Sequence, residues 1–199
     1  MMYTVLRAIV TFIYKIVYNL KIEGKENIPK TGGHIFASNH RSYADPVLIS
    51  LAVPKRFAYM AKEELFKNPL FSLLIRTMGA FPVTRGKGDT AVIDTAVEKL
   101  KGGRNLVIFP EGTRSYDGKV GRGKSGVSLI AAKAGTDVIP VGIIFEGKKL
   151  KFRSKLIVRY GKPIKLDETE LSATSASELK GLKLRIMGAI TELVEGDGN

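Results

Sequence analysis

The stretch GHIFASNHRSYADP, residues 33–46, decides the fold of this chain. Its first part, residues 33–38, is a short apolar run of the kind that forms a buried strand. Pro46 opens a second apolar segment, residues 46–53, which predicts a helix. The polar residues between them therefore form a loop at the carboxyl end of a strand. A strand, a loop and a helix in this order are typical of an α/β domain.

That loop carries His40 and Asp45. The chain has two histidines and no cysteine, so few other side chains are available for acid–base chemistry near neutral pH. On one continuous helix, residues five apart would point about 140° apart, but a turn between strand and helix lets them meet. Asp45 would then hold the imidazole in one tautomer and stabilise its protonated form. The alternative is that Asp45 is an ordinary N-cap before a proline at the first helical position.

The rest of the chain alternates short apolar runs with amphipathic helical patterns. This alternation predicts one α/β domain over residues 21–199, with a mixed, largely parallel sheet flanked by helices and preceded by an N-terminal amphipathic helix over residues 1–20. The further strands are expected at residues 57–60, 80–83, 105–109, 138–145 and 156–160, and the further helices at residues 68–78, 89–100, 127–134 and 177–194.

The N-terminal segment MMYTVLRAIVTFIYKIVYNL is the most apolar part of the chain, but Arg7 and Lys15 interrupt it. A spanning helix needs roughly 20 largely uncharged residues, and no small-residue cleavage site follows, so neither a transmembrane helix nor a signal peptide is expected. On a helical wheel, Arg7 and Lys15 share one narrow polar stripe. This pattern favours a helix in the membrane interface with both cations toward lipid phosphates. Packing of the helix on the protein's own core remains the alternative.

The charge balance points to polyanionic partners. Thirty-two Lys and Arg residues against 19 Asp and Glu leave a net charge of +13 over 199 residues. Nucleic acid, anionic lipid, phosphorylated metabolites and acidic carrier proteins all fit this excess, and a merely solubilising surface is the alternative. The lack of cysteine excludes disulfides, thiolate metal sites and a cysteine nucleophile.

Three further segments add to the loop of His40: MGAFPVTR at 78–85, FPEGTRS at 109–115 and VIPVGI at 138–143. The first two deliver Arg85 and Arg114 just after predicted strands. Ligands of α/β sheets bind at the carboxyl ends of strands. Two arginines beside a general base predict a site for an anionic, phosphorylated substrate that bears a hydroxyl.

These segments, in this order, resemble the four motifs of the glycerolipid acyltransferases. The resemblance runs from about Ile22 to Lys165 and is most specific in NHRSYADP and FPEGTRS. It implies an enzyme that transfers a fatty acyl group from acyl-CoA or an acyl carrier protein to the sn-2 hydroxyl of 1-acyl-glycerol-3-phosphate, forming phosphatidic acid. It also implies no metal and no cofactor, a membrane lipid as substrate, and a peripheral or monotopic position on the cytoplasmic face of the cell membrane.

The resemblance assigns a role to each motif residue. His40 would deprotonate the acceptor hydroxyl, and Asp45 would orient His40. Arg85 would hold the acceptor phosphate, and Lys62 would be an extra phosphate contact. The loop after the third motif strand would shape the acceptor site through Glu111, Gly112, Thr113 and Arg114. Pro140, in the fourth motif, would be structural or near the acyl chain.

Other functions are compatible with parts of the sequence. A relative that uses another lysophospholipid or acyl acceptor would carry the same motifs, and a non-catalytic module that binds nucleic acid or membranes would carry the same charge. GKVGRGKS at 118–125 matches a nucleotide-binding loop but does not leave a strand directly, so no nucleotide is expected there. With the enzyme as the favoured interpretation, nucleic acid is not an expected partner. Ser38 and Ser42 lack the G-x-S-x-G turn of a serine hydrolase. His34 is expected to be a hydrogen-bonded structural residue.

Overall fold

The structure is a computed structural model of the whole chain and describes residues 2–83 and 90–196. The strands of its sheet are β1 (Asn19–Glu23), β2 (Ile35–Ser38), β3 (Phe57–Lys62), β4 (Ala80–Val83), β5 (Asn105–Ile108), β6 (Val138–Phe145) and β7 (Lys155–Tyr160). The helices are α1 (Met2–Val17), α2 (Asp45–Ser50), α3 (Pro69–Thr77), α4 (Thr90–Lys101), α5 (Gly126–Ala134), α6 (Glu168–Ser172) and α7 (Lys180–Glu195), with short 3-10 turns η1 (Lys25–Asn27) and η2 (Glu63–Phe66).

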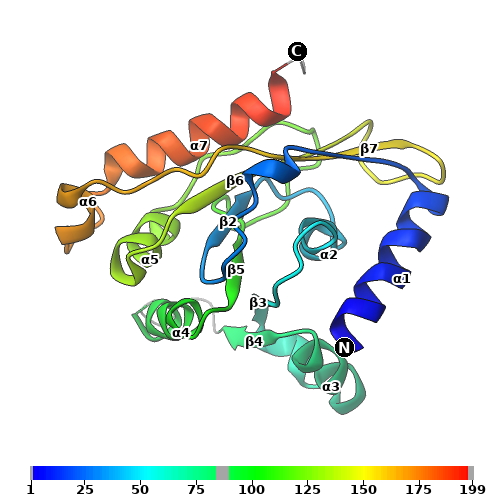
Figure 1. Cartoon of the computed structure of the whole chain (residues 1–199), viewed down its shortest axis with the longest axis horizontal. Helices are drawn as coiled ribbons and strands as arrows, with labels where there is room; N and C mark the ends of the chain where they lie inside the picture. The colour runs from blue at the N-terminus through cyan, green and yellow to red at the C-terminus, as the bar shows by residue number, and fades with distance from the viewer. Residues whose placement is uncertain (1, 84–89, 197–199) are drawn as a thin grey trace.

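The strands form one sheet in the order β1-β7-β6-β2-β5-β3-β4 (Figure 1). Strands β2 to β6 run parallel to one another, and β6 and β7 form an antiparallel hairpin. Every residue of β2 and β5 is buried, as is usual for parallel strands covered on both faces. The predicted fold class, a single α/β domain with a largely parallel mixed sheet, is confirmed.

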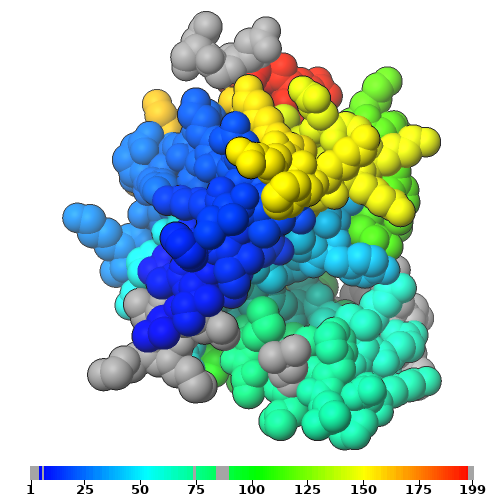
Figure 2. Space-filling model, turned by 90° about the vertical axis from the view of Figure 1, so that its right-hand side faces the viewer, coloured from blue at the N-terminus to red at the C-terminus, as the bar shows by residue number. Residues whose placement is uncertain are grey.

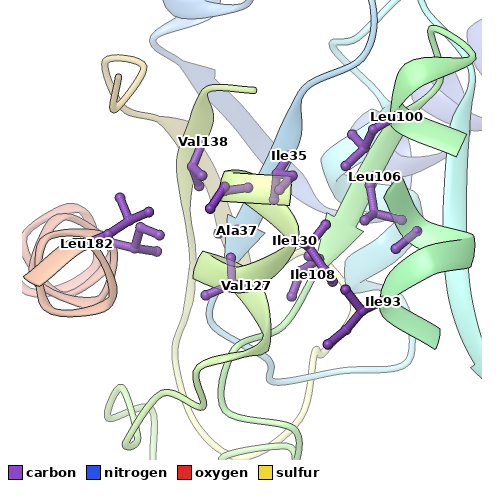
Figure 3. Packing of buried hydrophobic residues seen from close by; sticks show 14 of the residues in the cluster. Ile35, Ala37, Ile93, Leu100, Leu106, Ile108, Val127, Ile130, Val138 and Leu182 are labelled. Atoms are coloured by element: carbon purple, nitrogen blue, oxygen red, sulfur yellow. The ribbon is translucent and has the colours of Figure 1, made fainter. Parts of the chain in front are cut away.

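Side chains alternate across the sheet and build a core on each face. In β2, Ile35 and Ala37 belong to the core under α4, α5 and α7, whereas Phe36 belongs to the core under α1 and α2. Figure 3 shows the first core, where Val127 and Ile130 of α5 lie against the strand residues. Helices on both faces leave the two ends of the strands as the places where a site can form.

Several elements differ from the sequence expectation, among them α2, which ends at Ser50 rather than at residue 53. The N-terminal helix ends at Val17 rather than at residue 20, because Asn19 and Leu20 already pair with Lys155 and Leu156 of β7. Strand β1 was not predicted, since its pattern NLKIE is polar and lies on the sheet edge. Helix α6 was missed for lack of length, although Asp167 and Glu170 form a capping box there.

The carboxyl ends of β2, β3, β5 and β6 lie at one edge of the sheet because these strands are parallel. The loops that follow β2 and β5 hold the motif residues of the candidate site. Strands β7 and β1 run the other way, so the β6–β7 connection and the end of α1 lie at this edge too.

Candidate active site

His40 and Asp45 meet in the loop that follows β2. The Nδ1 atom of His40 lies 2.8 Å from Oδ2 of Asp45. The His40 side chain is 20% exposed, whereas the carboxylate of Asp45 is fully buried. A buried carboxylate on Nδ1 fixes the tautomer and leaves Nε2 to exchange a proton with a bound molecule. The contact that the spacing allowed is therefore present.

Asp45 does not serve as the helix cap that was the rival interpretation. Helix α2 begins at Asp45, its N-cap is Ala44, and no side chain caps it. Instead, Oδ2 of Asp45 accepts the backbone N–H groups of Arg41 at 2.6 Å and Ser42 at 2.7 Å, both upstream in the loop. The carboxylate of Asp45 thus binds the ring of His40 and the backbone of the two residues that follow it.

Glu111 connects the third motif to the loop between β2 and α2, residues 39–44. It follows β5, and its Oε1 atom accepts the backbone N–H of His40 at 2.9 Å while Oε2 accepts that of Gly121 at 2.8 Å. In the same region, the N–H of Ser115 donates to the carbonyl of His40 at 2.8 Å. The Glu111 side chain was expected to shape the acceptor site. In the structure its carboxylate binds two backbone amides, so its described contacts position His40.

Two residues that sequence reasoning left without a role complete the support of His40. The ring of Phe109 stacks on the imidazole with centroids 4.0 Å apart. Asn39 is buried and exchanges hydrogen bonds with both backbone groups of Ile143 in β6, at 2.8 and 2.9 Å. The amide therefore fixes the end of β2 against its neighbour. The signal for Asn39 was its place in the motif beside His40, although the motif alone does not say which partner it binds.

Arg114 lies on the exposed side of the site. Its guanidinium centre is 3.7 Å from the centroid of the Tyr43 ring, and its Nη2 atom donates to the Tyr43 hydroxyl at 3.0 Å. Arg114 and Thr113 line an open hollow of about 440 Å³ that also includes Glu111 and Lys119. Tyr43, which sequence reasoning missed, holds the plane of the guanidinium so that its remaining donors are available to an anion.

The other predicted site residues have different positions. Gly112 has φ +72°, in the left-handed region that favours glycine, so its place in the site is explained by the backbone of the turn. Lys62 is exposed at the end of β3, which β5 separates from β2. Arg85 lies outside the described residues. No three His, Asp or Glu side chains of the described residues lie together in a way that could hold a metal ion.

The N-terminal helix packs on the body of the protein through Val10, Tyr14 and one residue of its polar stripe, Arg7, whose inward orientation differs from the expected one. The Nη1 atom of Arg7 donates to the carbonyl of Leu51 at 2.8 Å, so this guanidinium turns inward and not toward lipid. Lys15 is exposed as expected. The opposite face is apolar and exposed, with Val5, Ile9, Phe12, Ile13 and Ile16 each about half open or more. Within the part of the chain that the structure describes, no helix has the length and apolar character needed to cross a membrane.

The ring of His34 does not form the hydrogen bonds that were expected of it, although its backbone does. Both of its ring nitrogens are buried without a partner among the described residues, and burial lowers the pKa of the imidazole, against a smaller opposing effect of Asp137. It precedes β2 and lies at the end of the sheet opposite His40, so it takes no part in the site. The glycine-rich segment 118–125 is a loop that packs on the site, with Gly121 bound to Glu111.

Together, the fold and the site define an α/β protein with a histidine–aspartate pair at the carboxyl ends of its parallel strands. Such a pair is suited to general base catalysis. A family model described as Acyltransferase matches residues 19–144, a range that includes all four motifs. The chain therefore belongs to the acyltransferase family, and the resemblance inferred from the motifs is confirmed.

Several relatives carry one name. The chain is 33% identical to a chloroplastic 1-acyl-sn-glycerol-3-phosphate acyltransferase of Arabidopsis thaliana, over 72% of this chain and 41% of that protein. It is 34% identical to the Streptococcus pneumoniae enzyme of that name, over 84% and 64% of the two chains. It thus spans less than two thirds of the length of either. The crystal structure of the 1-acyl-sn-glycerophosphate acyltransferase of Thermotoga maritima is similar, with a TM-score of 0.72 and 29% identity over 97% of this chain and 81% of that one.

Proposed function

We propose that this protein transfers a fatty acyl group from an acyl thioester to the sn-2 hydroxyl of 1-acyl-glycerol-3-phosphate, forming phosphatidic acid. The observation that carries the proposal is the 2.8 Å contact between His40 and Asp45 in a chain of the acyltransferase family. The names of its relatives support lysophosphatidic acid as the acceptor. A family member acting on another lysophospholipid is the nearest alternative.

The chemistry needs one proton shuttle. Nε2 of His40 accepts the proton of the acceptor hydroxyl while its oxygen attacks the thioester carbonyl. The tetrahedral intermediate collapses, the C–S bond breaks, and His40 returns the proton to the leaving thiolate. Asp45 stabilises the imidazolium between these two transfers. Direct attack forms no acyl-enzyme, which suits a chain that has no cysteine.

The cations of the site hold the anionic ends of the substrates in this proposal. Arg114, whose guanidinium stacks on the ring of Tyr43, binds the acceptor phosphate together with Arg85, and Lys62 is an extra phosphate contact. The donor is acyl-CoA or an acyl carrier protein, both of which are polyanions that suit a net charge of +13. No metal or other cofactor enters these steps.

The substrate is a membrane lipid, and we propose that the protein works on the cytoplasmic face of the membrane as a peripheral or monotopic protein. The exposed apolar face of α1 supports this position. Lys15 remains a proposed contact for lipid phosphates, whereas Arg7 serves to pack α1 on the body.

The proposal is tested by incubating the purified protein with a labelled acyl thioester and a panel of lysophospholipids, using both donor types. Label in phosphatidic acid is expected with lysophosphatidic acid. Transfer only to another acceptor would favour the alternative within the family. Absence of transfer with every pair, combined with salt-dependent binding of DNA, would contradict the enzyme assignment and favour a basic binding module.

A further inference from the structure

The loop of the β6–β7 hairpin, residues 146–154, carries the sequence EGKKLKFRS. We refer to it as the basic hairpin loop. Its cations Lys148, Lys149, Lys151 and Arg153 are all exposed, and none forms an ion pair in the part of the chain that the structure describes. Phe152 stands among them and is 72% exposed. The loop therefore presents one aromatic side chain and four cations to the solvent.

The basic hairpin loop is fastened to α1. The backbone N–H of Arg153 donates to the carbonyl of Val17 at 2.7 Å, and the N–H of Asn19 donates to the carbonyl of Ser154 at 3.0 Å. Figure 2 shows the loop, in yellow, beside α1, in dark blue, on one face of the molecule. The basic hairpin loop thus lies beside the helix whose apolar side chains are exposed.

The basic hairpin loop is also hydrogen-bonded to the loop between β2 and α2, residues 39–44. The contact is made by Arg41, a buried residue to which the motifs assigned no role. The Arg41 guanidinium donates to the carbonyl of Phe145 and, at 2.6 Å, to that of Gly147, while its backbone N–H donates to Asp45. The base of the hairpin and the carboxylate that orients His40 therefore share one residue. The basic hairpin loop therefore lies close to the loop that carries His40.

We propose that the basic hairpin loop is a second membrane contact, which binds anionic phospholipid head groups through its lysines and inserts Phe152 at the interface. Aromatic side chains and clustered cations are the residues that anionic membrane surfaces select. Continuity with the apolar face of α1 favours lipid over an acidic protein, since a protein partner would have to cover that face as well. This inference rests on the membrane position proposed for α1, whereas the acyl transfer reaction itself does not depend on it.

The test uses the full-length protein and the triple variant Lys148→Gln/Lys149→Gln/Lys151→Gln. Binding is measured by sedimentation with vesicles of phosphatidylcholine alone and of phosphatidylcholine mixed with phosphatidylglycerol. The triple variant is expected to lose about 100-fold in affinity for the anionic vesicles, because each cation near the surface contributes about fivefold. Its binding to the neutral vesicles should not change. Phe152→Ser is expected to weaken binding to both vesicle types by about tenfold.

A matched control removes three exposed lysines from other surfaces, Lys101→Gln/Lys165→Gln/Lys180→Gln, with the same change in net charge. It should bind both vesicle types like the wild type. Equal losses in the control and the hairpin variant would overturn the proposal, since net charge alone would then explain binding. So would unchanged vesicle binding together with lost binding of an acyl carrier protein, which would make the loop a donor-docking surface.

Acyl transfer to lysophosphatidic acid in uncharged detergent micelles separates this inference from the proposed function. The triple variant should keep wild-type turnover there, because no anionic membrane is involved. If the wild type itself transfers no acyl group, the proposed function fails while the vesicle result still decides the role of the loop. If turnover in micelles falls with the loop lysines, they act on a substrate, and the membrane role is wrong.

Discussion

At the scale of single residues, the site depends on carboxylates whose partners are mostly backbone amides. Asp45 binds the imidazole and two amides, and Glu111 binds two amides across the site. The sequence could predict His40 with Asp45, because the motif spacing places a turn between them. It could not predict what Glu111 contacts, since a carboxylate after a strand suits a substrate cation as well as a backbone N–H group.

The variant Glu111→Gln distinguishes the two roles of Glu111, support of the His40 backbone and direct binding of the acceptor. The amide can accept from His40 or from Gly121 but cannot satisfy both, so His40 loses part of its support. We expect kcat to fall by roughly 10- to 100-fold, the effect of losing one hydrogen bond to a charged group, while KM for the acceptor changes little. A raised KM with unchanged kcat would instead show that Glu111 binds the acceptor directly.

His34 should make the stability of the protein depend on pH. Burial lowers the pKa of His34 in the folded state, so the unfolded chain takes up its proton first as the pH falls. The contribution of the neutral ring is complete above the unfolded pKa of about 6.5 and is lost as the pH falls from there toward the folded pKa. The wild type should lose up to about 1.4 kcal/mol of unfolding free energy per pH unit relative to His34→Gln in that range.

The measurement is denaturant unfolding of both proteins between about pH 7.5 and about pH 5.5. Parallel pH profiles of wild type and variant would show that His34 titrates as it does in the unfolded chain. Because the comparison is with a variant at the same position, the titration of His40 and of the carboxylates cancels.

At the scale of elements, α1 shows where pattern reasoning succeeds and fails. The helix, its polar stripe and its wide apolar face were all predictable from spacing. Which face meets the body was not, because a cationic stripe can face phosphates or buried carbonyls equally well. In the structure, the Arg7 guanidinium finds the carbonyl of Leu51, and the apolar face is left exposed. The helix packs on the body and still presents an interfacial surface.

Substitution on that exposed face should release the protein from membranes. In Ile9→Ser/Phe12→Ser, two side chains that are 51% and 66% exposed become polar, so folding should be unaffected. Affinity for neutral and anionic vesicles should both fall by at least about tenfold, because apolar burial in the interface is lost. The matched control is Leu171→Ser/Leu184→Ser, which changes two exposed leucines of α6 and α7. Equal effects of the two pairs would argue against a membrane role for α1.

At the scale of the whole molecule, the carboxyl ends of the parallel strands bring together loops that are far apart in the sequence. His40 follows β2, Glu111 and Arg114 follow β5, and the basic hairpin loop follows β6. Alternating apolar runs predicted the parallel strands, and parallel strands place their following loops together. The order of the strands could not be predicted from the sequence. It is decided, together with their register, by side chains of both cores that come into contact only in the folded sheet.

The proposed function requires His40 as the general base, and single-turnover acyl transfer to lysophosphatidic acid tests this role most directly. The matched pair is His40→Ala and His34→Gln, which change the two histidines of the chain one at a time. We predict that His40→Ala lowers the rate of the chemical step by about 10²- to 10⁴-fold, while His34→Gln keeps the wild-type rate at neutral pH. A His40→Ala protein that is folded and transfers the acyl group at the wild-type rate would show that His40 is not the general base.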